Sequence, residues 1–306
     1  MRTICLAVLA ALVTGHGAGA GQVPANAPSM PAEYAAVLQA VNRQGDYKDN
    51  VLKVNVPRSD LKVVVDGVAT PTPFGFGGWF ALTKGDHGME VMMGDLVLTE
   101  DEVNPVMSAL LENGLEVSAL HNHFFFDSPR IFYMHVHGHG TAAELANRLK
   151  PALGLIGKTP LRSGTAPASV GRAIEGKLDT DGLSKTIGFP GEQSAAVYKI
   201  TIGRSDFTLK EMGATINARM GLNTWAAFYG SDADAVVAGD IAMLDGEVQP
   251  VLKVLRANGI NVVAVHHHMT GTTPTVFFLH YWGRGAAAKL ALGVKAAIDK
   301  TGPAAR

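Results

Sequence analysis

The sequence has few cysteines, few charged residues and no excess of basic ones. Cys5 is its one cysteine, 17% of the 306 residues are charged, and the net charge is −1 at pH 7. A single cysteine excludes an internal disulfide and any metal site built from several thiolates. The balanced charge lacks the basic surface that binding to nucleic acid or to an anionic membrane requires. We therefore expect a small molecule or a metal ion as the partner.

The first 20 residues have the pattern of a cleavable signal peptide. Arg2 precedes ten apolar residues, Ile4 to Val13, and Ala18-Gly19-Ala20 provides a cleavage site. Ten residues are too few for a membrane-spanning helix, which needs about 20. Cleavage after Ala20 would remove Cys5, and no later segment is long and apolar enough to span a bilayer. We expect a periplasmic or secreted protein without a membrane anchor, and leave its oligomeric state open.

An internal duplication organises the rest of the sequence. Arg58-Ser59-Asp60 recurs as Arg204-Ser205-Asp206 at an offset of 146, and after one deleted residue the offset becomes 145. The matched residues include Gly75 with Gly221, Trp79 with Trp225, Gly94-Asp95 with Gly239-Asp240, Glu102 with Glu247 and Pro105 with Pro250. The boundaries follow as a lead-in at 21–31, a first repeat at 32–152, a linker at 153–177 and a second repeat at 178–300.

Each repeat reads as an α+β unit. In the first repeat, strands are expected around 51–56, 61–65, 79–83 and 89–98, because apolar and β-branched residues alternate with Gly and Pro breaks. Thr99 followed by Glu102 is a capping box that begins a helix ending at Asn113-Gly114. Residues 115–124 and 131–137 are expected to form a hairpin. The sequence thus predicts a tandem duplication of an α+β unit, an antiparallel or mixed sheet with helices on one face, and a pseudo-twofold axis.

Histidine is the residue type with an unusual distribution. Of the ten histidines after the leader, five lie between His121 and His139 and four between His266 and His280. Alternation along a strand places His121 and His123 on one face, and His135 and His137 likewise. A turn at 127–128 would pair positions whose numbers sum to about 256, with His121 opposite His135. Imidazoles about 5 Å apart across a hairpin can bind one ion at about 2.1 Å per nitrogen.

The comparison of repeats gives a ligand set for each one. His121, His123, His135 and His137 form the predicted principal metal site, and His266, His268 and His280 match the first three. Trp282 replaces His137, so we expect a weaker or degenerate second site with a bulky apolar wall. A site without thiolates suits a divalent transition metal, Zn²⁺ or copper before nickel or iron. Whether the protein is an enzyme stays open.

Three further residues are candidates for the same site. If the strand that ends at Leu98 runs parallel to the strand that follows the helix, Glu102 and Asp95 lie near the histidines, as do their copies in the second repeat. Glu102 is then a candidate general base, although it also completes the capping box. Asp95 is a candidate substrate-binding residue, although after Gly94 it also suits a turn. Trp79 offers an aromatic floor for a flat ligand or a sugar, or packs in the core.

Two functions remain open after this reading. The first is an exported metal-binding protein, either without catalytic activity or with hydrolytic or redox activity. The alternative is a metal-free periplasmic binding module, whose neutral histidines hydrogen-bond a polar small molecule or a sugar above Trp79. Left unprotonated and without a ligand, four buried histidines need partners for their donors and acceptors.

Three segments of the sequence together are similar to one known family. They are the segment that begins at Gly94-Asp95 and continues through Asn-Pro-Val-Met, the run from Leu120-His-Asn-His to Met-His-Val-His-Gly138, and Val-Tyr-Lys-Ile-Thr-Ile-Gly-Arg-Ser-Asp206. They resemble the LppY/LpqO family of exported bacterial proteins. The resemblance covers nearly the whole chain after the leader. It implies an exported location and no particular reaction, since the family's function is unknown.

Overall fold

The structure is a computed structural model that describes residues 29–158 and 171–302. The predicted signal peptide lies outside the described residues, as do 21–28 of the predicted lead-in and 159–170 of the predicted linker. Among the described helices, none combines the length and the hydropathy needed to cross a membrane.

The chain folds into two similar α+β repeats, as the sequence predicts. The first contains α1 (Ala32–Val41), β1 (Gly45–Lys48), β2 (Val51–Pro57), β5 (Gly77–Lys84), β6 (Glu90–Thr99), α2 (Glu100–Glu112), β7 (Glu116–His121), β9 (Ile131–Gly140) and α3 (Ala142–Leu155). The second contains α4 (Thr180–Ile187), β10 (Gly191–Ser194), β11 (Val197–Gly203), β14 (Asn223–Gly230), β15 (Ala235–Leu244), α5 (Asp245–Ala257), β16 (Asn261–His266), β17 (Val276–Gly285) and α6 (Ala287–Ile298).

Each repeat is built on a six-stranded antiparallel sheet. The strand orders are β1-β2-β5-β6-β9-β7 and β10-β11-β14-β15-β17-β16. β6 and β7 are both antiparallel to β9, so they run parallel to each other, with β9 between them. Helix α2 begins where the capping box predicts, and the Glu102 carboxylate accepts the amide hydrogen of Thr99 at 2.8 Å.

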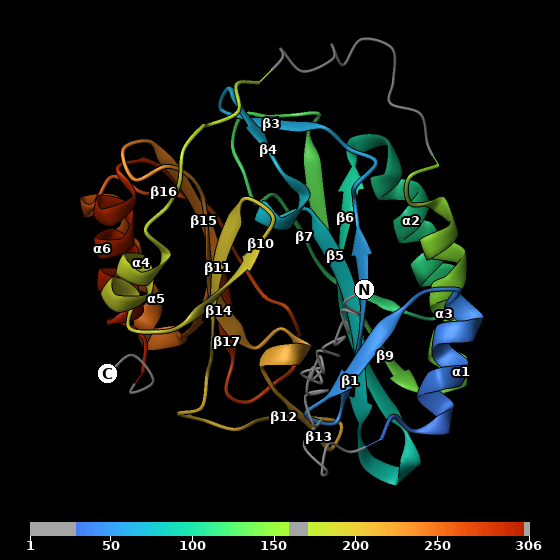
Figure 1. The fold of residues 1–306 in the computed structure, drawn as a ribbon. Coiled ribbons are helices and arrows are strands. Elements are labelled where there is room, and N and C mark those ends of the chain that lie inside the picture. The colour runs from blue at the N-terminus through green and yellow to red at the C-terminus, as the bar shows by residue number, and fades with distance from the viewer. Residues whose placement is uncertain (1–28, 159–170, 303–306) are drawn as a thin grey trace, which may run out of the picture.

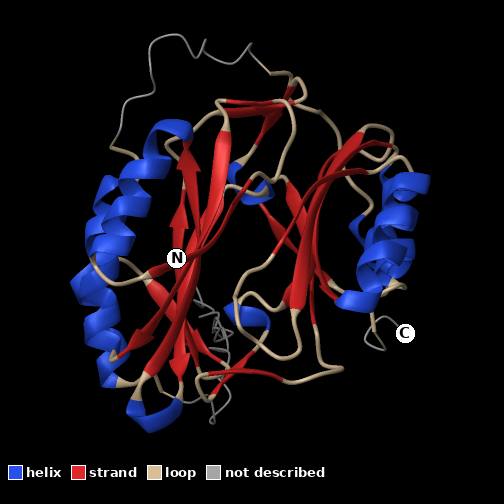
Figure 2. Ribbon diagram, turned by 180° about the vertical axis from the view of Figure 1, so that it is seen from behind, coloured by secondary structure: helices blue, strands red, loops and turns tan. Residues whose placement is uncertain are grey.

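The two sheets face each other, and the helices cover their outer faces (Figures 1 and 2). Alternation along β6 illustrates the arrangement. Met92, Leu96 and Leu98 pack in the core under the helices of the first repeat. Met93 and Val97 point to the opposite face and pack in clusters that include residues of the second repeat. The central strands are therefore buried on both faces, which explains their nearly continuous apolar sequence.

Each repeat also extends a short hairpin onto the other repeat. The first arm is β3 (Val63–Val65) and β4 (Val68–Thr70), and the second is β12 (Leu209–Glu211) and β13 (Ala214–Ile216). Val65 of the first arm shares an apolar cluster with Val236 of the second repeat. Leu209 of the second arm shares one with Met93 of the first repeat. This exchange of arms fixes how the two sheets sit against each other.

A buried ion pair closes each repeat. The Arg58 guanidinium donates to Glu102 Oε2 at 2.6 Å, to the Val97 carbonyl at 2.8 Å and to the Asp60 carboxylate. Glu102 also accepts the amide hydrogen of Gly157 at 2.6 Å. The Arg58–Asp60 pair that recurs in the sequence is therefore one part of a larger network.

The second repeat reproduces the same network. Arg204 donates to Glu247 at 2.8 Å, to the Ala242 carbonyl at 2.7 Å and to Asp206. Glu247 accepts the amide hydrogen of Gly302 at 2.7 Å. In both repeats the pair joins the end of a central strand, the first turn of a helix and the segment after the last helix.

Removal of Glu102 is expected to destabilise the protein strongly. Glu102→Ala removes one of the two carboxylates that pair with the buried Arg58, and losing one partner of a buried pair costs about 3–5 kcal/mol. Asp299→Ala breaks the exposed Lys295–Asp299 pair and is expected to cost about 1 kcal/mol or less. Urea denaturation of both variants provides the comparison. Equal losses of stability would contradict a structural role for Glu102.

Candidate metal centre

The histidines of the two repeats meet in one buried cluster between the sheets. The ring centroids of His121 and His266 lie 3.7 Å apart, and those of His123 and His280 lie 3.5 Å apart. His135 and His268 form a third contact across the repeats, at 4.1 Å. The expectation of two separate sites, a principal one in the first repeat and a weaker one in the second, is therefore wrong. The sheets pack with their histidine-bearing faces together, so six histidines form a single cluster.

Strand register explains which side chains share this face. His121 pairs with Tyr133, and His135 pairs with Ala119, so the predicted pairing of His121 with His135 is off by two residues. The first strand of the hairpin ends at His121 and not at residue 124, which lengthens the connection to β9. A shift of two positions preserves the face of every side chain. His121 and His135 therefore remain on the same side, with ring centroids 5.1 Å apart.

Four of the histidines have one ring nitrogen held by a backbone carbonyl. Their Nδ1 atoms lie 3.2–3.3 Å from carbonyl oxygens, in the pairs His135–Gly94, His266–His267, His268–Gly221 and His280–Gly239. A carbonyl only accepts, so each Nδ1 carries the proton and each Nε2 keeps a free lone pair. Among the described residues, none of these four Nε2 atoms has a hydrogen-bond partner. Metal-binding histidines are commonly oriented in this way.

The Nε2 atoms of His121 and His123 face each other. Their Nε2 atoms lie 3.2 Å apart, and their buried Nδ1 atoms have no partner in the described part of the chain. A hydrogen bond between two Nε2 atoms requires one protonated and one unprotonated nitrogen. An ion bound between them would use both lone pairs.

Burial keeps the six imidazoles neutral at pH 7. Burial is the largest cause that lowers the pKa of every one of them, and at least one neighbouring histidine adds to it in each case. The pKa of His266 falls to about 4 and that of His268 to about 3. The neutral imidazole is the form that binds metals.

Asp240 and Asp95 lie beside the histidines. Asp240 pairs with His280 in the sheet and Asp95 pairs with His135, which places both carboxyls on the inner faces. Asp240 Oδ2 lies 3.4 Å from His268 Nε2, and its Oδ1 accepts the amide hydrogen of Leu279. Burial raises the pKa of Asp240 to about 7 and that of Asp95 well above its usual value. The predicted position of Asp95 at the site agrees with this geometry.

Three groups of these side chains have the spacing of metal ligands. In each group the ligand atoms lie within 4.8 Å of one another, and the groups are His121–His123–His280, His121–His135–His266 and Asp240–His266–His268. Nitrogens bound to one ion at about 2.1 Å lie at most about 4.2 Å apart, so small side-chain movements suffice. Two of the groups combine residues from both repeats.

Glu102 and His137 do not join the cluster. Glu102 is held by Arg58 and two backbone amides, so its predicted role as a general base is not supported by its position. His137 Nε2 lies 3.0 Å from the Glu211 carboxylate, which belongs to the arm of the second repeat. The predicted fourth ligand of the first repeat therefore contacts a different partner.

Trp282 does not form a wall of the site either. Its ring contacts Phe74 and Phe124 edge-on, with centroids 5.9 and 5.7 Å apart, in an apolar cluster that joins the repeats. The residue at this position, histidine in the first repeat and tryptophan in the second, depends on which arm packs against it. Glu211 of one arm meets His137, while Val65, its counterpart in the other arm, shares the cluster of Trp282.

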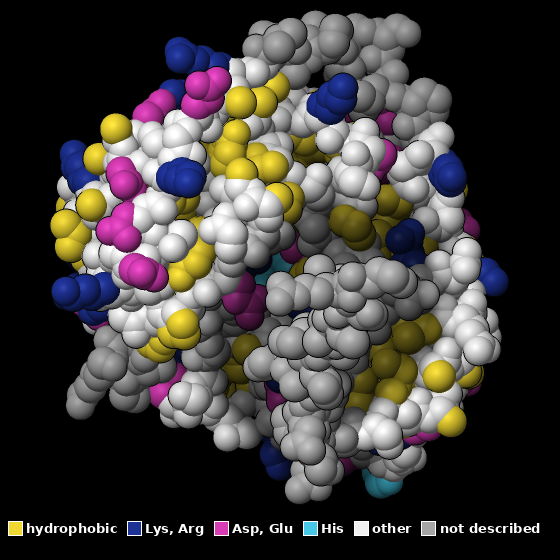
Figure 3. All heavy atoms as spheres, viewed as in Figure 1, with side chains coloured by type: hydrophobic (Ala, Val, Ile, Leu, Met, Phe, Trp, Pro, Cys, Tyr) yellow, Lys and Arg dark blue, Asp and Glu magenta, His cyan; other side chains and the backbone are white. Residues whose placement is uncertain are grey.

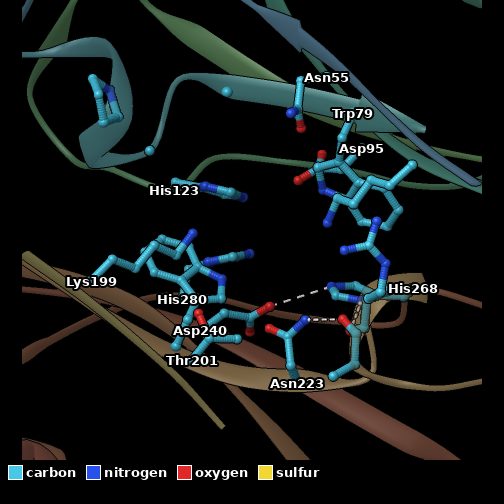
Figure 4. Close-up of a pocket in the computed structure, with 18 of the residues that line it drawn as sticks. Asn55, Trp79, Asp95, His123, Lys199, Thr201, Asn223, Asp240, His268 and His280 are labelled. Carbon is cyan, nitrogen blue, oxygen red and sulfur yellow. Dashed lines mark hydrogen bonds and ion pairs between the residues drawn. The ribbon is translucent and has the colours of Figure 1, made fainter. Parts of the chain in front are cut away.

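A cavity of about 410 Å³ lies against the histidine cluster. It is lined by His123, His268 and His280, by both aspartates, and by Trp79 and Trp225. Figure 4 shows side chains from both repeats projecting into it, with Trp79, Asp95 and His123 opposite Lys199, Asp240 and His280. In the space-filling view a histidine is visible in the hollow between the two repeats, with charged side chains beside it (Figure 3).

Sequence reasoning missed two lysines that line the same cavity. Lys53 Nζ lies 4.3 Å from the centre of the Trp79 ring, and Lys199 Nζ lies 4.2 Å from that of Trp225. The two lysines match at the offset of 146 that also relates Arg58 to Arg204. That recurrence was the signal that could have identified them. Trp79 lines the cavity as predicted, with a lysine over its ring.

Comparisons with known proteins give a family without an assigned activity. A family model described as "Domain of Unknown Function (DUF1259)" matches residues 35–155 and 181–300. No curated protein matches the sequence. EtuB from Clostridium kluyveri is similar at 9% identity over 84% of this chain and 90% of that one, with a TM-score of 0.19. A trimeric bacterial microcompartment shell protein, PduB, is similar at 10% identity over 83% and 90%, with a TM-score of 0.20.

Acid is expected to destabilise the metal-free protein already between pH 6.5 and 4.5. Unfolded histidines have a pKa near 6.5, so below it the unfolded state binds more protons than the folded one. Each histidine whose pKa is lowered in the folded state then removes up to about 1.4 kcal/mol of stability per pH unit. Asp95 and Asp240, whose pKa values are raised, act in the opposite sense and offset about two of the six histidines.

Urea denaturation of chelator-treated protein at successive pH values measures this slope. His268→Gln removes one buried imidazole and is expected to make the slope shallower. His87→Gln, at an exposed position, is the matched control and should leave the slope unchanged. Stability that stays constant from pH 7 to 5 would contradict the burial of neutral histidines.

Proposed function

The chain belongs to the DUF1259 family, and we propose that it is an exported metal-binding protein whose site is shared by its two repeats. The observation that carries this proposal is the set of Nε2 atoms in His135, His266 and His280 that have no partner among the described residues, together with His268 Nε2, whose one contact is the Asp240 carboxyl at 3.4 Å. A buried polar atom without a partner costs about 1–3 kcal/mol. A bound ion would use these lone pairs and remove that cost.

The donor atoms indicate the kind of metal. Among the described residues the candidate ligands are imidazole nitrogens and one carboxylate, which suit Zn²⁺ or Cu²⁺, as the sequence led us to expect. His121–His123–His280 and Asp240–His266–His268 share no residue, so two ions could bind without competing for ligands. The His135 ring has a neighbour in each group, with centroids 5.1 Å from His121 and 4.1 Å from His268.

The cavity beside the cluster gives the site room for a reaction. A divalent metal there would supply a Lewis acid or a redox centre, and hydrolytic or redox activity would follow. Asp95 lines the cavity, and its raised pKa favours a protonated carboxyl that can donate to a bound molecule. The Oδ1 atom of Asp95 has no partner among the described residues, so it is free to do so.

The proposed export depends on the first 20 residues and on the resemblance to the LppY/LpqO family. A periplasmic or secreted protein meets metals outside the cytoplasm. Residues 1–20 fused to a reporter enzyme that is active only after export provide a direct check.

A metal-free binding module is the alternative, and the cavity favours it as much as it favours an enzyme. One observation counts against a sugar stacked on Trp79 or Trp225, since a lysine ammonium already covers one face of each ring. Under this alternative a chelator leaves the melting temperature unchanged. Under the metal-binding proposal the chelator lowers the melting temperature, because a bound ion stabilises the folded state.

Protein purified without a histidine tag is expected to contain metal. His121→Ala and His266→Ala, one in each repeat, should lower the metal content to a similar extent, because both belong to the shared cluster. His137→Ala and His87→Ala are the controls and should retain it, since His137 pairs with Glu211 and His87 is exposed. Elemental analysis gives the readout.

Negligible metal in the wild-type protein, even after incubation with Zn²⁺ or Cu²⁺, would refute the proposal. A loss confined to the variant of one repeat would refute the shared site and restore the idea of two separate ones.

A further inference from the structure

We propose that the cavity beside the histidine cluster takes a small organic anion, a carboxylate or a phosphate compound, whose charged group binds to Lys53 and Lys199. This inference deepens the proposed function and rests on it for the part that the histidines play. It names the class of ligand that the site receives.

The two lysines have no counter-ion. Among the described residues, neither Lys53 nor Lys199 donates a hydrogen bond or forms an ion pair within 4.0 Å; their close contacts are with the rings of Trp79 and Trp225. Partly buried ammonium groups are usually paired with a carboxylate. With pKa values of about 8, both still carry their charge at pH 7.

The acidic side chains that attract the lysines, Asp46, Asp95 and Asp240, form no ion pair with either of them within 4.0 Å. Asp46 lies opposite Lys53 on the neighbouring strand but forms an ion pair with Arg219 at 2.6 Å. Glu192 lies opposite Lys199 and makes no ion pair with it. Asp240 accepts the Leu279 amide hydrogen and lies beside His268. The lysine charges are therefore available to a ligand.

The sheet fixes where the lysines present their charge. Asn55 pairs with Trp79, so Lys53 is the diagonal neighbour of that tryptophan, and Lys199 has the same relation to Trp225. A cation over an indole ring is attracted to it, which holds the long side chain in place. Both lysines line the cavity that also contains His123, His268 and His280. An anion bound by the ammonium groups would lie next to the proposed metal ligands.

The size of the cavity indicates an organic molecule as the ligand. A volume of about 410 Å³ is within the range of small-molecule sites and exceeds what a single inorganic anion fills. The lining supplies the rest of the recognition. Asn55, Thr201 and Asn223 provide hydrogen-bonding groups, and the two tryptophans provide apolar surface.

Titrations with succinate and with inorganic phosphate, followed by tryptophan fluorescence, test the inference on chelator-treated full-length protein. Saturable binding of at least one of them is expected, and Lys53→Met and Lys199→Met should each weaken it about tenfold or more. Lys150→Met, at an exposed helical position, is the control and should bind like the wild type. Glucose is the neutral probe and should not bind.

Lys53→Arg and Lys199→Arg keep the charge and should retain most of the affinity. The two anions separate a preference for carboxylate from one for phosphate. Anion binding that is equally strong in the Met variants would overturn the inference. So would a protein that binds glucose but neither succinate nor phosphate.

Metal content measured on the same proteins separates this inference from the proposed function. Lysine-dependent anion binding in a protein that never takes up metal would support the anion site while the metal proposal fails. Normal metal content together with anion binding that depends on neither lysine would overturn the anion site and leave the metal proposal intact.

Discussion

The burial of six uncharged imidazoles between two sheets is the constraint on which the rest of this structure depends. Burial lowers the pKa of each ring, so each ring stays neutral and each buried nitrogen needs a partner. Backbone carbonyls hold one nitrogen of His135, His266, His268 and His280, and the other is left for a ligand. A charge or a bulky apolar group at these positions would disturb both repeats at once.

The rest of the molecule keeps the two sheets in contact. The arms exchanged between repeats bury apolar residues on either side of the histidines, and the Arg58 and Arg204 networks anchor each repeat behind its sheet. Neither repeat can complete the cluster alone, since two of the three ligand groups draw on both. The duplication thus produces a histidine cluster that a single copy would lack.

The two halves of the molecule differ where their arms differ. His137 with Glu211 forms a polar contact between repeats, and Trp282 with Val65 belongs to an apolar one at the equivalent place. The two side chains of each pair are chemically compatible. An exchange that placed Glu211 beside Trp282 would bury a carboxylate against an indole. The change from histidine to tryptophan therefore adjusts the packing of an arm and leaves the shared site unaffected.

The sequence by itself determined the duplication, the α+β class, the start of α2 at Thr99 and the face on which the histidines lie. These features follow from local signals, namely recurrence at a fixed offset, capping and the two-residue period of strands. The sequence also predicted that Asp95 and Trp79 belong near the histidines. Only the tertiary structure decided that the histidines of both repeats form one cluster, that His137 and Glu102 bind other partners, and that Lys53 and Lys199 line the cavity. Those outcomes depend on how one sheet packs against the other, and alternation within a strand specifies a face without specifying what will cover it.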